Sequence, residues 1–177
     1  MLETHGRNRC TSGVLRCRPI IRRDTGLSPN QSMNHWLVKT EPEKYGWSHF
    51  TAQGRSVWDG VRNYQARNNL ASMKLGDQVL FYHSVSSPAV VGVATVVREA
   101  YPDPTAPAEP TGKPTPWCVV ELEPVLAFIQ PVLLARIKAD PMLATMGLIK
   151  QSRLSVMPVK PDEFDQILGW GTGESGD

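Results

Sequence analysis

The chain has 177 residues, of which 41% are hydrophobic, and its 19 basic and 17 acidic side chains give a net charge of +2. A chain of this length favours one domain, with or without a tail, and a domain of this size folds without disulfides. The near-balance of charge excludes a strongly basic domain that binds the nucleic-acid backbone without specificity. Any contact with nucleic acid must therefore be local.

Positive charge is concentrated in the first 32 residues, which hold six arginines against Glu3 and Asp24, while the rest of the chain is net negative. Glycines and prolines interrupt any amphipathic helix in this segment. We expect residues 1–32 to be a basic tail, either disordered or an artefact of an upstream start, because Met33 directly precedes the first expected strand. The domain is expected over residues 33–169, with a flexible tail at 170–177.

The three cysteines, Cys10, Cys17 and Cys118, lack the spacing of a metal site and are an odd number for a disulfide framework. No apolar stretch approaches the roughly 18 residues that span a membrane. We therefore expect a cytoplasmic protein that binds no metal, uses no cofactor and contacts no membrane. We also expect a monomer.

The first expected element is a strand over residues 35–40, where polar and apolar side chains alternate. Two helices should follow, because N-capping residues and glycines delimit two segments there. The first helix should begin after Ser48 and end at Gly54. The second should open at Asp59 or at Gly60, run from Val61 to about Met73, and be terminated by Gly76.

Residues 78–83 and 89–99 are rich in valine and aromatic side chains and flank a turn, so they predict an antiparallel pair. Six prolines between residues 102 and 116 remove backbone donors and predict a long surface loop. A strand over residues 117–128 and helices over residues 131–138 and 161–168 complete the chain. Because strands dominate, we predict an α+β fold, with a curled mixed sheet or barrel flanked by short helices.

The segment from Val57 to Leu70 places recognition chemistry where a structural helix would place apolar residues. It offers flat aromatic faces, planar cations suited to phosphate, and amides suited to base edges or to backbone capping. These side chains are Trp58 and Tyr64, Arg62 and Arg67, and Asn63, Asn68 and Asn69. The set indicates a nucleotide-binding segment, while Trp58 taken alone equally fits the core, the usual place of a tryptophan.

Two strand ends hold further candidates, since rigid strand ends present side chains to ligands. The Ser84 hydroxyl can donate to or accept from a base edge, whereas a lone histidine such as His83 is more often structural. The first strand end fits either a base-contacting edge or a solvated terminus with a local ion pair. The candidates are Lys39, Thr40 and Glu41 at the first strand end, and Tyr82, His83 and Ser84 at the second.

Three residues further along the chain add to this set. Tyr101 precedes the proline-rich segment and could form the second wall of an aromatic sandwich. Arg153 and Ser155 follow an expected turn. By itself, Arg153 fits a surface arginine paired with a carboxylate equally well.

Six motifs, in this order along the chain, resemble the EVE domain. They are Trp36-Leu-Val-Lys39-Thr40-Glu41-Pro42, Trp58 to Leu70, Phe81-Tyr82-His83-Ser84, Val91-Gly92-Val93-Ala94, Arg98-Glu99-Ala100-Tyr101-Pro102-Asp103 and Arg153-Leu154-Ser155-Val156. The resemblance covers about residues 33–168 and implies a PUA-like β-barrel, similar to YTH and PUA domains, with a pocket for a single modified base. It further implies that Trp58 stacks on the base and that Arg153 holds a flanking phosphate.

The resulting hypothesis is a binding module, not an enzyme, that recognises a modified nucleobase such as a 5-substituted cytosine. It would flip the base from DNA or RNA into an aromatic pocket. The alternatives are an enzyme acting on a modified nucleotide or small metabolite in the same pocket, and a peptide-binding module; no glycine-rich phosphate loop or nucleophile elbow signals catalysis. The expected pocket residues are Lys39, Thr40, Glu41, Trp58, Asn63, Tyr82, His83, Ser84, Tyr101 and Ser155, and the expected phosphate-binding residues are Arg62, Arg67 and Arg153.

Overall fold

A computed structural model describes residues 33–107 and 115–174, and these residues form one six-stranded mixed sheet in the order β2-β5-β4-β3-β1-β6. The central strands β1 and β3 run parallel, and the other neighbours are antiparallel. The strands are β1 His35–Thr40, β2 Ser56–Trp58, β3 Gln78–His83, β4 Ala89–Pro102, β5 Cys118–Leu133 and β6 Val156–Val159.

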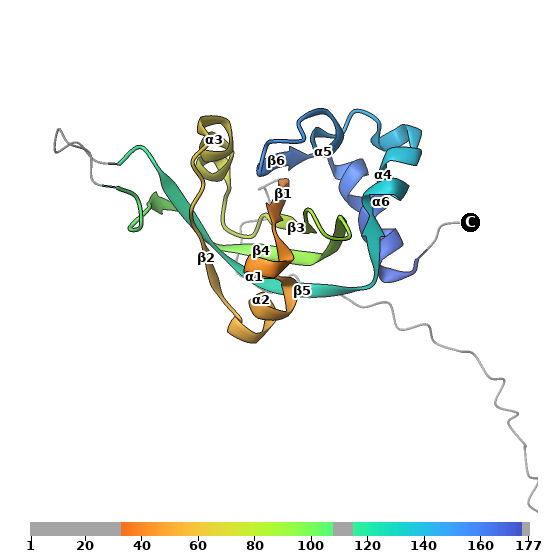
Figure 1. The fold of residues 1–177 in the computed structure, drawn as a ribbon, viewed down its shortest axis with the longest axis horizontal. Helices are drawn as coiled ribbons and strands as arrows, with labels where there is room; N and C mark the ends of the chain where they lie inside the picture. The colour runs from red at the N-terminus through yellow and green to blue at the C-terminus, as the bar shows by residue number, and fades with distance from the viewer. Residues whose placement is uncertain (1–32, 108–114, 175–177) are drawn as a thin grey trace, which may run out of the picture. The chain divides into compact units, whose positions relative to one another are not determined.

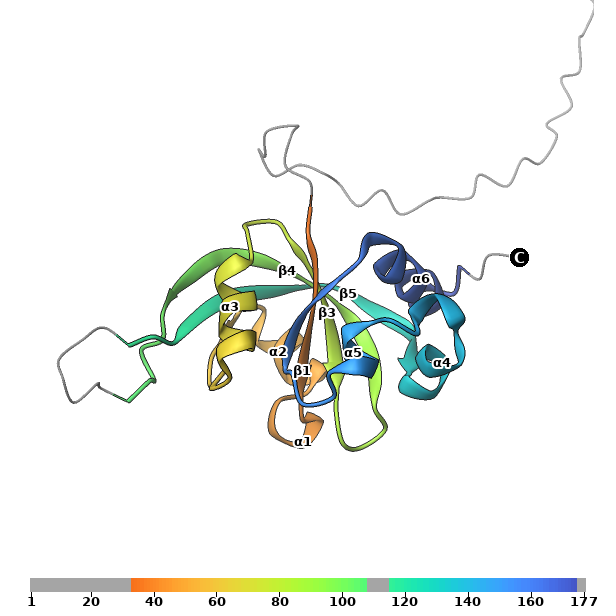
Figure 2. The ribbon, with the colours of Figure 1, turned by 90° about the horizontal axis from the view of Figure 1, so that it is seen from above.

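Short helices flank this sheet on both sides of its central strands. In Figures 1 and 2, α3 lies on one flank of β1, while α4, α5 and α6 gather on the other. The helices are α1 Pro42–Tyr45, α2 Trp47–Gln53, α3 Tyr64–Ser72, α4 Leu134–Ala139, α5 Gly147–Lys150 and α6 Pro161–Thr172, with a 3-10 turn, η1, at Pro141–Leu143. The predicted α+β class, a mixed sheet flanked by short helices, is confirmed.

The bounds of β1 and β3 match the predicted strands, whereas other predicted elements shift. β5 extends to Leu133 where a helix was expected from Pro131. β2 pairs with residues 120–122 only, so this edge of β5 carries no partner strand beyond them among the described residues. An edge position needs no backbone donor, which explains why Pro131 is tolerated in the strand.

Helix α3, which corresponds to the second predicted helix, begins at Tyr64, three residues later than predicted, because its N-cap is Asn63. The Asn63 side chain accepts a hydrogen bond from the Ala66 N–H at 3.0 Å. Similarly, α2 is preceded by Gly46 at its N-cap, not by Ser48, although it ends at Gly54 as predicted. The last helix continues past its predicted end to Thr172.

Parts of three sequence predictions fall outside the described residues. These are the basic segment 1–32, positions 108–114 of the proline-rich segment, and the end of the chain at 175–177. The described flanks of the proline-rich segment, residues 103–107 and 115–117, contain neither helix nor strand, in agreement with the predicted loop.

The core lies around β1 and β3, whose central residues are buried on both faces of the sheet. Helices cover both faces, so these strands carry continuous apolar runs, as parallel strands usually do. The fully buried residues here include Leu37 and Val38 in β1 and Val79, Leu80 and Phe81 in β3.

A buried carboxylate joins the starts of the two parallel strands. Asp77 directly precedes β3 and is only 3% exposed. Its Oδ2 accepts hydrogen bonds from the Trp36 indole at 2.8 Å and from the Lys74 N–H at 2.9 Å, and its Oδ1 accepts from the Asn34 N–H at 3.1 Å. Because Asn34 and Trp36 belong to the start of β1, this side chain fixes β1 beside β3.

We expect Asp77→Ala to lower the free energy of unfolding by about 3 kcal/mol or more, because it leaves three donors without their acceptor at about 1–3 kcal/mol for each buried one. Urea unfolding followed by circular dichroism measures the loss. The matched control is Asp59→Ala, which removes an exposed carboxylate. Equal stability of the two variants would show that the Asp77 contacts do not hold the strands together.

Candidate functional site

The carboxyl ends of β1 and β3 meet at one edge of the sheet. Thr40, the last residue of β1, aligns with His83 at the end of β3. The Thr40 carbonyl accepts hydrogen bonds from the Ser84 N–H at 2.8 Å and from the Ser84 hydroxyl at 2.9 Å. The Thr40 hydroxyl donates to the Tyr45 carbonyl at 2.9 Å, which ties α1 to the same edge. The two strand ends therefore form one rigid unit.

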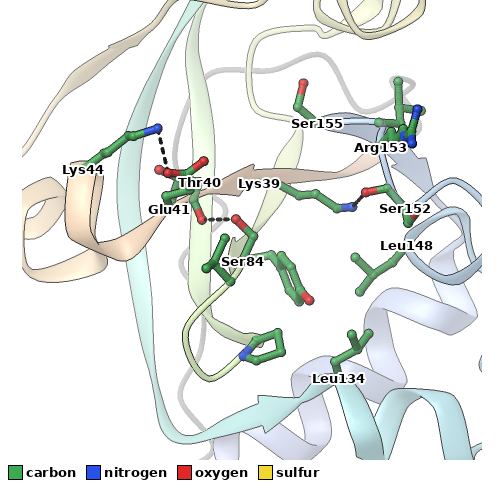
Figure 3. A pocket seen from close by; sticks show the side chains of 14 residues that line it. Lys39, Thr40, Glu41, Lys44, Ser84, Leu134, Leu148, Ser152, Arg153 and Ser155 are labelled. Atoms are coloured by element: carbon green, nitrogen blue, oxygen red, sulfur yellow. Dashed lines mark hydrogen bonds and ion pairs between the residues drawn. The ribbon is translucent and has the colours of Figure 1, made fainter.

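A pocket of about 520 Å³ opens at this edge. Figure 3 shows the aliphatic side chains of Leu134 and Leu148 across the pocket from the polar residues Thr40 and Ser155. The polar lining consists of Lys39, Thr40, Glu41, Lys44, Ser84, Ser152, Arg153 and Ser155. The apolar lining consists of Tyr82, Val85, Pro88, Leu134, Leu148 and Leu154.

Lys39 reaches across the pocket from β1. Its ammonium donates to the Ser152 carbonyl at 2.8 Å (Figure 3). It also lies 5.9 Å from the ring centroid of Tyr82. Burial lowers the pKa of Lys39 and raises the pKa of the Tyr82 phenol. The ammonium thus has one fixed protein acceptor and further donors for a ligand.

The lining of the pocket is net positive. Lys39, Lys44 and Arg153 contribute three cations, and Glu41 contributes the single carboxylate, which pairs with Lys44 at 2.7 Å. Among the described residues, no carboxylate lies within ion-pair distance of Lys39 or Arg153. This pocket is therefore suited to a ligand that combines an anionic group with an apolar surface.

The structure brings seven of the residues predicted from the sequence together around this pocket. They come from three separate stretches of the chain, and they are Lys39, Thr40, Glu41, Tyr82, Ser84, Arg153 and Ser155. The Thr40 hydroxyl already donates to a backbone carbonyl, so this group has a structural partner. The contacts of these residues with a base stay a prediction.

Trp58 lies away from this lining, in an aromatic cluster of the core. It is 8% exposed, and its ring centroid lies 5.7 Å from Phe81 and 6.4 Å from Tyr45 in edge-on contacts. Phe81 and Tyr82 are neighbours in β3, and successive strand residues point to opposite faces of a sheet. Because Tyr82 lines the pocket, Trp58 packs on the other face, and its predicted stacking on a base stays a prediction.

His83 also points away from the pocket lining and has a structural partner. Its Nε2 accepts a hydrogen bond from the Trp47 N–H at 3.1 Å, which joins β3 to the start of α2. Only the neutral imidazole can accept this bond. Burial lowers the pKa of His83, and the nearby Glu43 carboxylate partly opposes this shift.

The predicted phosphate ligands Arg62 and Arg67 lie outside the pocket lining, and each has a protein partner. Arg62 binds the buried carboxylate of Asp103 at 2.7 Å, and Arg67 donates to the Pro116 carbonyl at 3.0 Å. Burial opposes ionisation of Asp103, but hydrogen bonds from Thr105 and Arg62 outweigh it and hold the pKa of Asp103 below its usual range. Phosphate binding by these two arginines stays a prediction.

Asn63 and Tyr101 also lie outside the pocket lining. Asn63 uses its side-chain oxygen to cap α3, so pairing of that oxygen with a base edge would cost the cap. The Tyr101 hydroxyl donates to Glu121 at 3.1 Å, and the Arg98 guanidinium lies 3.9 Å from the Tyr101 ring centroid. The Tyr101 ring is thus covered by a cation of its own strand.

Sequence reasoning missed half of the pocket lining. Lys44 belongs to α1, a helix of a single turn that leaves no periodic pattern to detect. Leu134 and Leu148 belong to α4 and α5, where a leucine reads as an ordinary core residue. Nothing local in the sequence indicates that they face β1.

Comparison with known proteins assigns the chain to a family. Residues 34–170, which make up most of the chain, match the EVE domain. The chain belongs to the EVE domain family. The resemblance seen in the sequence is therefore confirmed, and the mixed sheet with short helices is the fold of this EVE domain.

Relatives of this EVE domain share about a third of its residues. Human thymocyte nuclear protein 1 is 35% identical over 164 residues, which cover 76% of this chain and 72% of that protein. A hypothetical protein from Leishmania major has a solved structure with a TM-score of 0.74 and 38% identity, covering 81% of this chain and 97% of that one.

Two solved neighbours were determined with nucleic acid. Human THYN1 in complex with DNA containing 5-methylcytosine has a TM-score of 0.71 and 34% identity, covering 81% of this chain and 99% of that one. A YTH domain from Zygosaccharomyces rouxii, in complex with N6-methyladenosine RNA, has a TM-score of 0.50 and 13% identity, over 82% of this chain and 88% of that one. The YTH match shows likeness of fold alone.

Two features are absent from the described part of this EVE domain. No helix within residues 33–107 and 115–174 is long and apolar enough to cross a membrane. The same residues contain no cluster of three or more histidine, cysteine, aspartate or glutamate side chains placed to hold a metal ion. The predicted cytoplasmic location and monomeric state stay predictions.

We expect Trp58→Ala to destabilise the EVE domain by about 3–5 kcal/mol, the usual cost of truncating a buried tryptophan. Thermal unfolding followed by circular dichroism measures this loss, and Val57→Ala, at an exposed neighbouring position, is the control. A Trp58→Ala variant that unfolds like the wild type but no longer binds a modified oligonucleotide would instead support the base-stacking role predicted from the sequence.

Stability should fall on mild acidification, because the lowered pKa of His83 means that the native state binds fewer protons than the unfolded chain. The contribution is fully present above the unfolded pKa of 6.5 and is lost as the pH falls through the lowered folded pKa. Burial also lowers the pKa of His35, which adds a dependence of the same sign.

The His83→Gln variant keeps an oxygen acceptor but does not titrate, so its free energy of unfolding should change less between pH 7 and about 5.5. Urea unfolding across this range measures the slope. His49→Gln replaces an exposed histidine and serves as the control. An unchanged slope in His83→Gln would exclude His83 as a source of the pH dependence.

Proposed function

We propose that this EVE domain is a binding module that accepts one modified nucleobase, such as a 5-substituted cytosine, from DNA or RNA into the pocket at the ends of β1 and β3. The observation that carries the proposal is the pairing of an apolar side with a cationic side in one pocket of about 520 Å³. Pockets for small ligands span about 300–1,000 Å³, so a nucleotide fits this volume.

The two sides of the pocket suit different parts of a nucleotide. The apolar side, with Leu134 and Leu148, suits the substituent of the base, and burying a methyl group there is worth about 0.8 kcal/mol. The Ser155 hydroxyl suits the base edge because it can donate or accept, and the Ser84 hydroxyl, which donates to the Thr40 carbonyl, can still accept from a base. Arg153, exposed at the rim, suits a flanking phosphate.

The energetics favour binding that depends on the modification. Extruding a paired base costs a few kcal/mol, and stacking returns about 1–3 kcal/mol, so an unmodified base gains little by entering. A modification that adds buried apolar area or a hydrogen bond then decides the balance. The relation to human THYN1, solved with DNA containing 5-methylcytosine, supports this ligand class.

The alternative function is an enzyme acting on a modified nucleotide or a small metabolite in the same pocket. The two proposals differ in the fate of the ligand. A binding module returns an oligonucleotide containing 5-methylcytosine unchanged after prolonged incubation, whereas an enzyme converts it to a product. Chromatography of the recovered nucleosides distinguishes these outcomes.

We expect Arg153→Ala and Leu134→Ala to weaken binding in different ways. Loss of the phosphate contact in Arg153→Ala should lower the affinity for oligonucleotides with cytosine and with 5-methylcytosine equally. It should also flatten the salt dependence of binding by about one unit of slope. Loss of apolar surface at Leu134 should instead reduce the preference for 5-methylcytosine, by up to about fourfold for one buried methyl group. Fluorescence anisotropy over a range of salt concentrations measures both effects.

Lys74→Ala is the matched control, because it removes the same charge at an exposed position outside the pocket lining. Its affinity and salt dependence should stay near those of the wild type. If neither Arg153→Ala nor Leu134→Ala alters binding of an oligonucleotide that the wild type binds, the ligand lies outside this pocket.

A further inference from the structure

An aromatic pair lies outside the pocket lining, formed by the exposed Tyr64 at the start of α3 and the half-buried Trp117 before β5. The ring centroids of Tyr64 and Trp117 are 5.0 Å apart, and their planes are tilted by 33°. Tyr64 leaves 62% of its surface exposed in spite of this contact. Its hydroxyl makes no hydrogen bond within the described residues. Since buried tyrosines usually bond their hydroxyl and hide the ring, this side chain resembles a contact residue more than a core residue.

Two arginines hold the aromatic pair in place. The Arg62 guanidinium lies 5.7 Å from the Trp117 ring centroid and is anchored by the buried Asp103. The Arg67 guanidinium lies 5.4 Å from the Tyr64 ring centroid and donates to a backbone carbonyl. Because both rings already have packing partners within the domain, we expect stacking on them to lose less side-chain entropy than stacking on a ring without such contacts.

The aromatic pair lies close to the rim of the pocket. Gln65, next to Tyr64, donates to the Gln151 side chain at 3.1 Å, and Gln151 directly precedes the pocket residues Ser152 and Arg153. Asn69 also joins α3 to β6 through the Val156 carbonyl at 2.7 Å. Figure 1 shows α3 beside β6, which follows the segment at the rim.

We propose that Tyr64 and Trp117 stack on the base of a nucleotide next to the one held in the pocket, so that the EVE domain binds a strand at two points. This inference rests on the proposed function, because it needs a strand whose modified base occupies the pocket. Aromatic faces suit this role, since every base has a flat face and stacking tolerates any sequence. Specificity then comes from the pocket, and affinity for the strand comes partly from the aromatic pair.

Stacking on the aromatic pair can be distinguished from a phosphate contact by its salt dependence. The buried Asp103 carboxylate neutralises Arg62 beside Trp117, whereas Arg67 beside Tyr64 bonds a backbone carbonyl and keeps its charge, which loss of the Tyr64 ring does not remove. A stacking contact adds affinity without releasing counterions, whereas a phosphate contact adds to the salt dependence. Loss of Tyr64 should therefore weaken binding while leaving the salt slope unchanged, in contrast to loss of Arg153.

The test compares Tyr64→Ala with the conservative Tyr64→Phe in full-length protein. Two probes are used: a short single-stranded oligodeoxynucleotide with one central 5-methylcytosine, and the free nucleoside 5-methyldeoxycytidine. We expect Tyr64→Ala to lower the affinity for the oligonucleotide by about 5- to 150-fold, the usual range for one stacked base. Tyr64→Phe should bind it like the wild type. Affinity for the nucleoside should be the same in all three proteins, because a nucleoside has no neighbouring base.

A second readout places the fluorescent base 2-aminopurine on either side of the 5-methylcytosine, since stacking quenches its emission. The wild type and Tyr64→Phe should quench the probe on one side, and Tyr64→Ala should not. Ile129→Ala, which truncates a 78% exposed apolar side chain on β5, controls for loss of surface hydrophobicity. Circular dichroism of each variant checks that it is folded.

Each outcome bears on one of the two proposals. Unchanged oligonucleotide affinity in Tyr64→Ala overturns the stacking role while the proposed function stands. An equal loss for oligonucleotide and nucleoside shows that Tyr64 shapes the pocket, which also overturns it. If the wild type binds neither probe in any modified form, the proposed function fails, and the inference that rests on it fails as well.

Discussion

The pocket depends on the parallel alignment of β1 and β3, and the buried carboxylate of Asp77 fixes that alignment from the far end of the two strands. It accepts hydrogen bonds from the start of β1 and from the turn before β3. Both strands then run six residues in continuous register and end together at Thr40 and His83. A slip of one residue would turn Tyr82 away from the pocket and bring Phe81 into its place.

The sequence was sufficient to predict the strands and the edge at which they end, because both follow from local patterns. Alternating or continuous apolar residues defined β1 and β3 with the bounds that the structure shows. Polar residues at the ends of those strands, such as Thr40 and Ser84, were singled out from the sequence, and the structure places both in the lining of one pocket, while their contacts with a base stay a prediction. Short elements such as β2 and α1 escaped prediction because three or four residues hold too little periodicity.

The rest of the site could not be predicted because it arises from contacts between distant parts of the chain. Leu134 and Leu148 face the end of β1 only after β5 has crossed the sheet and α4 and α5 have folded back. The surroundings of Trp58 were likewise not predictable from its neighbours in the sequence. Its polar sequence neighbours suggest an exposed ring, yet β2 pairs with residues near the start of β5, and the Trp58 ring is buried in the core.

Charge pairing explains how a domain with little net charge can present a local site for an anion. Half of the lysines and arginines in the described residues pair with a carboxylate; for example, Arg62 binds Asp103, and Arg55 and Arg98 both bind Glu121. At the pocket, by contrast, Lys39 bonds a backbone carbonyl, and Arg153 has no carboxylate within ion-pair distance in the described part of the chain. Lys39 and Arg153 therefore leave positive charge at the pocket, and salt limits the reach of exposed charges to about 10 Å at moderate ionic strength. A single carboxylate among three cations in the pocket lining thus gives a local site suited to an anionic group, without an excess of basic residues over the whole domain.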